Sequence, residues 1–240
     1  MVSTKPWPVQ AQMAVPLRYR LLFYYLVPLA EQWDCPVMTM IFSQHSASKA
    51  RIRKELLRKR RALDRDAWLQ NSGEIFRRVT SIPEILDAER IHCYVSMELE
   101  REVFTQELLE WFCLERKEVY LPYIERGRMV AACYYGGHRF MASKFGPPVP
   151  EPLILSDEDR FDAVIVPLVG YDRRGCRIGY GKGWYDRFFG DLSSRGIHPA
   201  RIGLAFGLQA VPWVPSDPWD EILDVVVTEN EIVNCLSSRA

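Results

Sequence analysis

The 240-residue chain has no excess of charge of either sign. Lysine plus arginine and aspartate plus glutamate number 31 each, so the formal net charge is zero. A chain without net positive charge has no bulk attraction to nucleic acid or to an acidic membrane surface. Any binding of an anion must therefore depend on a local group of cations. The hydrophobic fraction of 48% and the charged fraction of 26% are those of an ordinary globular domain.

The chain also lacks the spacings that metal and redox centres require. None of the six cysteines stands at the two-residue separation of a zinc ribbon or a redox pair. The four histidines are equally scattered. We therefore expect free thiols in a reducing cytoplasm and no metal site built on histidine or cysteine. The residues concerned are Cys35, Cys93, Cys113, Cys133, Cys176 and Cys235, with His45, His92, His138 and His198.

A long apolar run is missing from the N-terminal region. Its aromatic-rich segment 21–30 is about half as long as a membrane-crossing helix. The segment follows Arg18 and Arg20, as in a signal peptide, but no small-residue cleavage site follows cleanly. Together with the prolines Pro6, Pro8, Pro16 and Pro28, this composition predicts a poorly ordered extension over residues 1–47. The organised domain is expected to span residues 48–235.

Two helices are predicted at the start of this domain. Strong helix formers fill residues 49–62, with Ser46 or Ser48 as the cap. Its many basic side chains are interpreted mainly as a solvated face, although one or two at the helix start could meet a phosphate. The second helix is capped by Asp64 and ends at 81–83. Its expected buried side comprises Ala67, Leu69, Ile75, Phe76 and Val79.

An alternation of strands and helices follows. Strands are predicted over residues 90–96, 118–121 (closed by Pro122), 129–135, 163–167, 201–205 and 225–228. Helices are predicted over 105–114 and from Trp184 to about Ser194, a hairpin turn over 125–128, and a proline-rich loop over 145–156. The fold class is therefore α/β, a single domain with a mostly parallel central sheet flanked by helices, plus an N-terminal helical arm.

The most informative segment runs from Tyr171 to Asp186 and contains alternating glycines at Gly179, Gly181 and Gly183. It lies between a buried strand and a helix start, where exposed backbone N–H groups and the helix dipole favour an anion. It is neither a P-loop nor the dinucleotide fingerprint, because the glycine spacings differ. The glycines by themselves are equally compatible with an ordinary tight turn.

Charged neighbours favour the phosphate interpretation. Arg177 offers a planar fork for phosphate oxygens, and Lys182 offers a movable point charge. Asp186 could hold a magnesium ion against those oxygens. A second carboxylate could come from Asp220, although the segment Asp217-Pro-Trp-Asp220 by itself is more typical of a turn.

Three acids follow the first predicted strand. Glu98, Glu100 and Glu102 alternate at the strand's carboxyl end, the edge at which ligands bind in open α/β sheets. They could form only a polar rim, or one of them could bind the amine or amide groups of a heterocycle.

Together these segments resemble the 5-formyltetrahydrofolate cyclo-ligase family, also called methenyltetrahydrofolate synthetases. The resemblance extends from about Ser46 to Val233, and the glycine segment with its preceding strand is its most specific part. The matching segments are Lys49-Ala-Arg-Ile-Arg53 with Arg58, Tyr94-Val-Ser-Met97, Leu121-Pro-Tyr123, Val166-Pro-Leu-Val-Gly-Tyr-Asp172, Arg177-Ile-Gly-Tyr-Gly-Lys-Gly-Trp-Tyr-Asp186 and Trp219-Asp-Glu-Ile-Leu-Asp-Val-Val-Val-Thr228.

The resemblance implies an enzyme that cyclises 5-formyltetrahydrofolate to 5,10-methenyltetrahydrofolate, with Mg²⁺ as cofactor and ATP as co-substrate. The formyl oxygen would be phosphorylated, and N10 would attack the resulting iminium phosphate. A cytoplasmic monomer without nucleic-acid or membrane partners is expected. The alternative of another class is a non-catalytic folate- or nucleotide-binding protein on the same scaffold.

The resemblance also implies a role for each matching residue. The implied catalytic residues are Lys182, Arg177 and Tyr185. ATP would contact Lys49, Arg53, Arg177, Ile178, Gly179, Tyr180, Gly181, Lys182, Gly183, Trp184 and Tyr185. Folate would contact Val95, Glu102, Tyr180, Gly181, Lys182, Gly183 and Trp184, and Asp186 and Asp220 would bind magnesium. Counting forward from Ser96 would instead select Glu100 as the folate-binding acid, while counting back from Thr105 selects Glu102.

Overall fold

The computed structural model describes residues 36–141, 148–157 and 160–235, and side chains from residue 44 onward. The poorly ordered extension was predicted over residues 1–47. Its residues 1–35 lie outside the described residues, whereas residues 36–47 are helical. Among the described residues, no helix combines the length and apolar composition that crossing a membrane requires.

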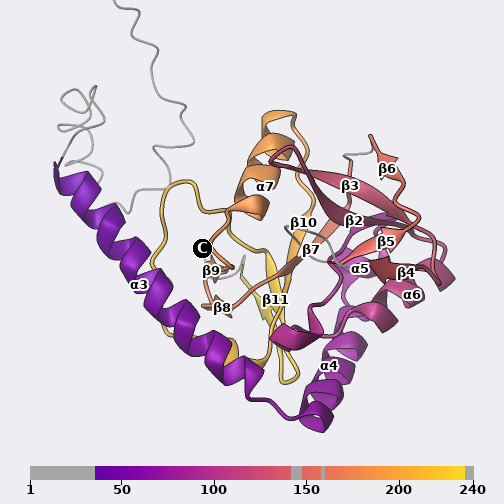
Figure 1. Cartoon of the computed structure of the whole chain (residues 1–240), viewed down its shortest axis with the longest axis horizontal. Helices are drawn as coiled ribbons and strands as arrows, with labels where there is room; N and C mark the ends of the chain where they lie inside the picture. The colour runs from indigo at the N-terminus through magenta and orange to yellow at the C-terminus, as the bar shows by residue number, and fades with distance from the viewer. Residues whose placement is uncertain (1–35, 142–147, 158–159, 236–240) are drawn as a thin grey trace, which may run out of the picture.

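An eight-stranded sheet forms the centre of the fold (Figure 1). Its strand order is β12-β11-β10-β7-β1-β2-β3-β6. The run from β11 to β2 is parallel, whereas β12, β3 and β6 pair antiparallel at the two sides. The predicted mostly parallel sheet is therefore confirmed. The bounds are β1 Arg90–His92, β2 Glu118–Glu125, β3 Arg128–Tyr134, β6 Leu155–Ser156, β7 Ala163–Pro167, β10 Ala200–Leu204, β11 Val225–Val227 and β12 Ile232–Asn234.

Helices cover both faces of this sheet. Helices α4 (Arg65–Val79), α5 (Pro83–Leu86) and α6 (Gln106–Leu114) pack on one face, against Ile91, Ile165 and Ile202. Helix α7 (Trp184–Ser194) packs on the other face, where its Phe188, Phe189 and Leu192 meet Val164 and Val166. Alternate residues of β7 thus enter opposite cores, as expected for a strand buried on both sides.

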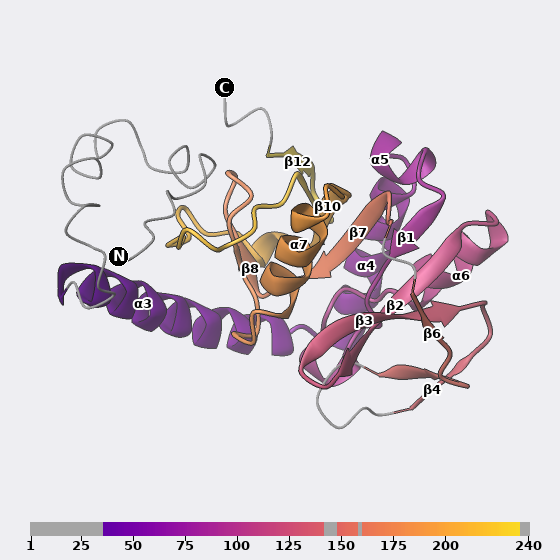
Figure 2. The same cartoon turned by 90° about the horizontal axis from the view of Figure 1, so that it is seen from above.

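The N-terminal arm is helix α3, which spans Pro36–Arg61. It lies beside a small hairpin made of β8 (Gly170–Tyr171) and β9 (Arg177–Ile178), as Figures 1 and 2 both show. Leu56 anchors it in a separate apolar cluster with Val169 and Ile178. A Cβ at Gly170 would lie 2.5 Å from Leu56 Cδ1, so the missing side chain lets the helix approach the hairpin backbone.

The helix predictions differ from the structure mainly at the start of the arm. The predicted cap at Ser46 or Ser48 is wrong, because both residues lie inside α3. The cap at Asp64 is confirmed, since its Oδ1 accepts from the backbone N–H of Ala67 at 2.8 Å. On α4, Ile75 and Val79 are buried as predicted, but Ala67, Leu69 and Phe76 are only partly so, and the fully buried members include Trp68 and Ser72.

Two strand boundaries also differ, for identifiable reasons. Beyond His92 the predicted first strand leaves the sheet, because the Thr105 hydroxyl accepts from Ser96 N at 3.0 Å and donates to Tyr94 O at 2.8 Å. Pro122 does not end β2. The β1 partner has ended at Tyr120, so the missing N–H of Pro122 stands on an unpaired side of the strand.

Several very short strands were not predicted. The predicted loop over 145–156 contains β5 (Val149–Glu151), which pairs with β4 (Arg139–Met141), and it also contains β6. Strands β8, β9 and β12 likewise comprise only two or three residues each. Such lengths carry too little periodicity to be recognised, because their pairing depends on partners supplied by the tertiary fold.

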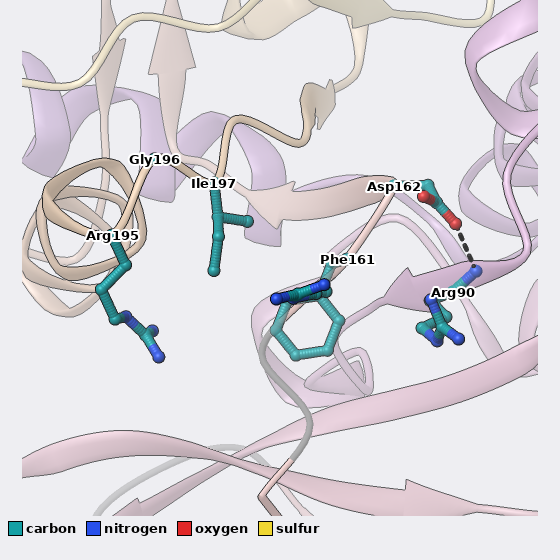
Figure 3. A pocket seen from close by; sticks show the side chains of 7 residues that line it. Arg90, Phe161, Asp162, Arg195, Gly196 and Ile197 are labelled. Carbon is teal, nitrogen blue, oxygen red and sulfur yellow. Dashed lines mark hydrogen bonds between the residues drawn. The ribbon is translucent and has the colours of Figure 1, made fainter.

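A cavity of about 560 Å³ lies at the amino ends of the parallel strands (Figure 3). It is lined by residues from the starts of β1, β7 and β10, among them Arg90, Phe161, Asp162 and Ile197. The Asp162 carboxylate accepts from the backbone N–H groups of Glu89 at 2.9 Å and Arg90 at 2.8 Å. This carboxylate therefore fastens the start of β1 to the start of β7.

We predict that Asp162→Ala destabilises the fold by about 1–3 kcal/mol, since two backbone donors lose their acceptor. Asp191→Ala is the control. It removes an exposed ion pair with Arg128, and a change of about 0.5 kcal/mol or less is expected. Urea unfolding of both variants measures the difference, and equal stabilities would contradict the anchoring role of Asp162.

Candidate functional site

The candidate site lies at the carboxyl ends of β1 and β7. These neighbouring strands are parallel, but the chain continues from β1 to β2 on one side and from β7 to β10 on the other. Such a reversal of strand order leaves a crevice in which α/β proteins bind ligands. The segment after β1 contains Val95 and Glu102, and the segment after β7 contains the glycine loop 179–183. The topology thus brings both predicted halves of the site together.

The glycine loop has a backbone that ordinary residues rarely adopt. Gly181 has φ of +87° and Gly183 has φ of +63°, both in the left-handed region. Gly183 is the N-cap of α7. The Gly179 carbonyl accepts from Arg53 Nε at 2.7 Å. The predicted loop between strand and helix is confirmed, and the arm helix α3 holds it from outside.

A buried chain of hydrogen bonds connects α3 to the acidic segment. Arg60, which is 2% exposed, donates through Nη2 to the Tyr180 hydroxyl. Tyr180 in turn donates to Glu102 Oε1 at 2.7 Å, and Glu102 Oε2 accepts from Met97 N at 2.7 Å. The Trp68 indole donates to the Glu102 carbonyl at 2.6 Å. The Glu102 carboxylate and the glycine loop are therefore fixed relative to each other.

The two candidate folate-binding acids have different surroundings. Glu102 is buried, and burial raises the pKa of its carboxyl group, against the lowering effects of the Met97 N–H, Arg60 and Tyr180. Glu100 instead forms an exposed pair with Arg61 at 2.7 Å. Of these two acids, Glu102 is the one that contacts the glycine loop, through Tyr180. This contact supports the selection of Glu102, whose role in binding folate stays a prediction.

Arg177 and Asp186 form an ion pair at the start of α7. Arg177 Nη2 lies 2.7 Å from Asp186 Oδ1, and Arg177 Nη1 donates to the Glu221 carbonyl. Asp186 Oδ1 also accepts from Glu221 N at 3.2 Å. Asp186 thus lies next to the segment that contains Asp220, so both predicted metal ligands come from adjoining segments.

Lys49 joins α3 to that segment. Its Nζ lies 2.7 Å from Asp217 Oδ2 and 2.5 Å from Asp220 Oδ2. Burial acts to lower the pKa of Lys49, but hydrogen bonds and charge from the two carboxylates outweigh it and raise this pKa. His45 Nδ1 lies 3.1 Å from Asp217 Oδ1. The described residues contain no group of three or more metal-ligating side chains.

Tyr185 has a buried hydroxyl that lacks a hydrogen-bond partner among the described residues. Burial raises the pKa of this phenol, and Cys93, Glu102 and Arg177 are the charged or titratable groups that act on it. Lys182 is exposed and forms no ion pair with the described residues. The exposed Lys182 ammonium group is therefore available to a ligand, whereas the Tyr185 hydroxyl lies in the core beside His92 and Phe189.

The other residues predicted to contact ATP or folate lie in different surroundings. Ile178 is buried in the cluster beneath α3, and Val95 is buried in the core that carries α4 and α6. Their side chains therefore contribute to packing. Trp184 lines a cavity of about 540 Å³ between α7 and the β2–β3 turn, and the Arg187 guanidinium lies 4.6 Å from its ring centre.

Comparison with known proteins shows the family of the chain. A model of the 5-formyltetrahydrofolate cyclo-ligase family matches residues 45–229. The chain belongs to this family. A relative from Saccharomyces cerevisiae, named 5-formyltetrahydrofolate cyclo-ligase, is 30% identical over 75% of this chain and 95% of that protein. The protein of the same name from Escherichia coli K12 is 27% identical over 72% of this chain and 96% of its own length.

Solved structures of the family share the fold. The Aquifex aeolicus 5,10-methenyltetrahydrofolate synthetase superimposes with a TM-score of 0.67 at 26% identity, covering 78% of this chain and 92% of that one. The Mycoplasma pneumoniae 5,10-methenyltetrahydrofolate synthetase gives a TM-score of 0.60 at 22% identity, covering 75% and 98%. At that identity the second likeness concerns the fold alone.

Sequence reasoning missed Arg60 and Asp217. Arg60 was included in a basic face interpreted as solvated, yet it is buried. Its spacing carries the signal, because Lys49, Arg53, Leu56 and Arg60 stand at intervals of four, three and four residues, which is one face of a helix. Leu56 belongs to an apolar stripe on this face and is buried under the hairpin. Cations that share such a stripe are candidates for a buried or ligand-facing position.

We predict that Gly181→Ala destabilises the protein by about 1–2 kcal/mol, because an L-residue at this positive φ is strained. The new Cβ would also lie 3.3 Å from Arg53 Cζ. Gly190→Ala is the matched control in α7, where nothing lies within 4 Å, and it should stabilise by about 0.5–1 kcal/mol. Chemical denaturation tests both signs, and a stabilised Gly181→Ala variant would contradict the loop conformation.

His92 generates a prediction about pH. It is fully buried beside Phe161 and Phe188, and burial lowers its pKa to about 3. The unfolded chain therefore binds a proton that the folded chain excludes, so this group reduces stability as pH falls from about 6.5 toward 3. The folded state loses up to about 1.4 kcal/mol per pH unit in that window.

The His92→Phe variant should not lose unfolding free energy in this way. Its unfolding free energy, compared with that of the original protein, should rise steadily on acidification below pH 6.5, whatever constant cost the substitution has. Urea unfolding at several pH values measures this difference. A difference that does not change with pH would contradict a neutral, buried His92.

Proposed function

We propose that this protein catalyses the ATP-dependent cyclisation of 5-formyltetrahydrofolate to 5,10-methenyltetrahydrofolate, with release of ADP and phosphate. The observation that carries the proposal is the hydrogen bond from Tyr180 to Glu102, which joins a glycine loop suited to phosphates to a buried carboxylate. Family membership and the names of the relatives support the same activity. The domain over residues 48–235 is proposed to carry it.

The proposed reaction has two covalent steps. The formyl oxygen attacks the γ-phosphorus of ATP, the bond from that phosphorus to ADP breaks, and an iminium phosphate forms. N10 then attacks the activated carbon, loses its proton to water, and phosphate leaves with the former formyl oxygen. The protein has to align the two substrates and neutralise charge as it moves.

The cations of the glycine loop suit the first step. Lys182 is exposed and forms no ion pair with a described residue, so its ammonium group is free to follow the transferred phosphoryl group. Arg177 would present its fork to phosphate oxygens beside the loop N–H groups. Tyr185 is proposed as the third catalytic residue. Its hydroxyl is buried beside His92 in the free protein and would have to turn out of the core to donate to a ligand oxygen. Lys49 and Arg53 would reach the ATP phosphates from α3.

The acidic segment suits the folate. An ionised carboxylate accepts about four hydrogen bonds, and Glu102 receives one on each oxygen from described residues. One acceptor position per oxygen remains for the amino and ring N–H groups of a pterin. Val95 and the loop residues from Tyr180 to Trp184 would complete this side of the pocket.

Magnesium is proposed as the cofactor, held by Asp186 and Asp220. The donor set fits, since magnesium takes one or two carboxylates and completes its shell with water and phosphate oxygens. Both carboxylates already form ion pairs, Asp186 with Arg177 and Asp220 with Lys49. When bound, the ion would supply positive charge against the phosphate oxygens. Action as a cytoplasmic monomer remains a prediction.

The competing function is a non-catalytic folate- or nucleotide-binding protein. It predicts ligand binding without ADP release. The presence of Arg177, Lys182, Tyr185 and Asp186 within the short stretch from β9 to the first turn of α7 favours the enzyme, because simple binding does not require a mobile cation beside the phosphates.

The direct test supplies purified protein with 5-formyltetrahydrofolate and Mg-ATP. We expect the absorbance of the methenyl product to appear together with stoichiometric ADP. Binding of both ligands with neither product would support the non-catalytic alternative. An intact substrate and no binding would overturn the proposed function altogether.

Two variants test the roles within the loop. We expect Lys182→Ala to lower kcat/KM by roughly 100-fold or more, as for the removal of a group that stabilises transition-state charge. Asp186→Ala should need much more magnesium for half-maximal rate. Arg173→Ala, an exposed cation paired with Glu231 on the same hairpin, is the control and should behave as the original protein. Unchanged rates for Lys182→Ala would remove Lys182 from the mechanism.

A further inference from the structure

We propose that Arg60 is the positioning residue of this site: it orients the Tyr180 hydroxyl and the Glu102 carboxylate so that folate finds a fixed, ionised acceptor. The inference rests on the proposed function. It goes beyond that function because it assigns a role to a residue of α3 that the phosphate- and metal-binding set does not include.

Arg60 touches each segment that borders the folate side. Its Nε donates to Glu100 O at 2.8 Å, in the segment after β1. Its Nη1 donates to Leu168 O at 3.0 Å, just after β7, and its Nη2 donates to Tyr180 in the glycine loop. One guanidinium therefore joins α3 to both segments that leave the β1–β7 crevice. A planar fork with several fixed donors is suited to such a junction, and an ammonium group is not.

These contacts determine where the Tyr180 proton lies. A guanidinium has donors only, so the Tyr180 oxygen must accept from Arg60. The hydroxyl proton is then directed to Glu102 Oε1, 2.7 Å away. With Met97 N on the other oxygen, the carboxylate is held in one orientation.

Arg60 also favours the charged form of a buried acid. Burial raises the pKa of Glu102, and the positive charge of Arg60 acts against that rise. Glu100 acts in the opposite sense, whereas the Tyr180 and Met97 hydrogen bonds favour the carboxylate. Tyr94 and Tyr185 are the other titratable groups close enough to interact with Glu102. Arg60 is the cation in this set.

The neighbouring arginine provides a matched control. Arg61 has a side chain that is 52% exposed, and it pairs with the Glu100 carboxylate at the surface. Both arginines thus contact Glu100, one through the backbone and one through the side chain. Substitution of Arg61 changes the charge of the same helix turn without touching Tyr180 or Glu102.

The experiment measures steady-state methenyl formation by Arg60→Met, Arg60→Lys and Arg61→Met over a range of pH. For Arg60→Met we expect the KM for 5-formyltetrahydrofolate to rise about 10-fold or more, as for the loss of a charged hydrogen bond, with a much smaller change in the KM for ATP. The acid limb of kcat/KM should move to higher pH, because Glu102 must be ionised and loses its neighbouring cation.

The other variants separate charge from geometry. Arg60→Lys should return the acid limb to its original position while the folate KM stays raised, and Arg61→Met should match the original protein. If Arg60→Met does not fold, the test rests on Arg60→Lys. A KM for 5-formyltetrahydrofolate equal to that of the original protein would then overturn the proposal. Equal losses for both substrates with an unmoved acid limb would reduce Arg60 to a structural role. Absence of product from the original protein would instead reject the proposed function.

Discussion

The contact between helix α3 and the β8–β9 hairpin is the interaction on which the site depends. Leu56 enters the apolar cluster under the hairpin, and Gly170 leaves the space for it. Because this apolar contact fixes the axis and rotation of the helix, cations on the same face reach fixed positions above the loop. Arg53 meets the Gly179 carbonyl and Arg60 meets Tyr180. Without the packing of Leu56 under the hairpin, the cations of α3 would be exposed to solvent.

Charge neutrality within the site has a clear physical basis. Taking one charge out of water is costly unless a partner and hydrogen bonds compensate it. Here each partly buried cation meets carboxylates or carbonyls: Lys49 meets Asp217 and Asp220, and Arg177 meets Asp186. Lys182 is the exception among the predicted phosphate contacts, and it is exposed. If Asp186 and Asp220 bind magnesium as proposed, Arg177 and Lys49 would exchange these carboxylates for the phosphates of the ligand.

Several features could be predicted because they are local. Alternation of apolar runs and amphipathic segments predicted a mostly parallel α/β sheet, and the Asp64 cap and the strand–glycine loop–helix order were confirmed. The short strands β4, β5, β6, β8, β9 and β12 were missed, since two or three residues carry no usable period. The start of α3 was misplaced because serines that can cap a helix also occur inside one.

The sequence by itself determined the fold class, the glycine loop and the identity of its charged neighbours, since propensity, periodicity and motif spacing are properties of adjacent residues. The tertiary structure decided which of the alternating acids meets the loop. Glu100 turns to the surface and Arg61, whereas Glu102 turns inward to Tyr180. It also decided that Arg60 is buried and Arg61 is exposed. Arg60 and Arg61 differ because packing against distant segments sets the rotation of α3, and this rotation determines which of the two side chains is buried.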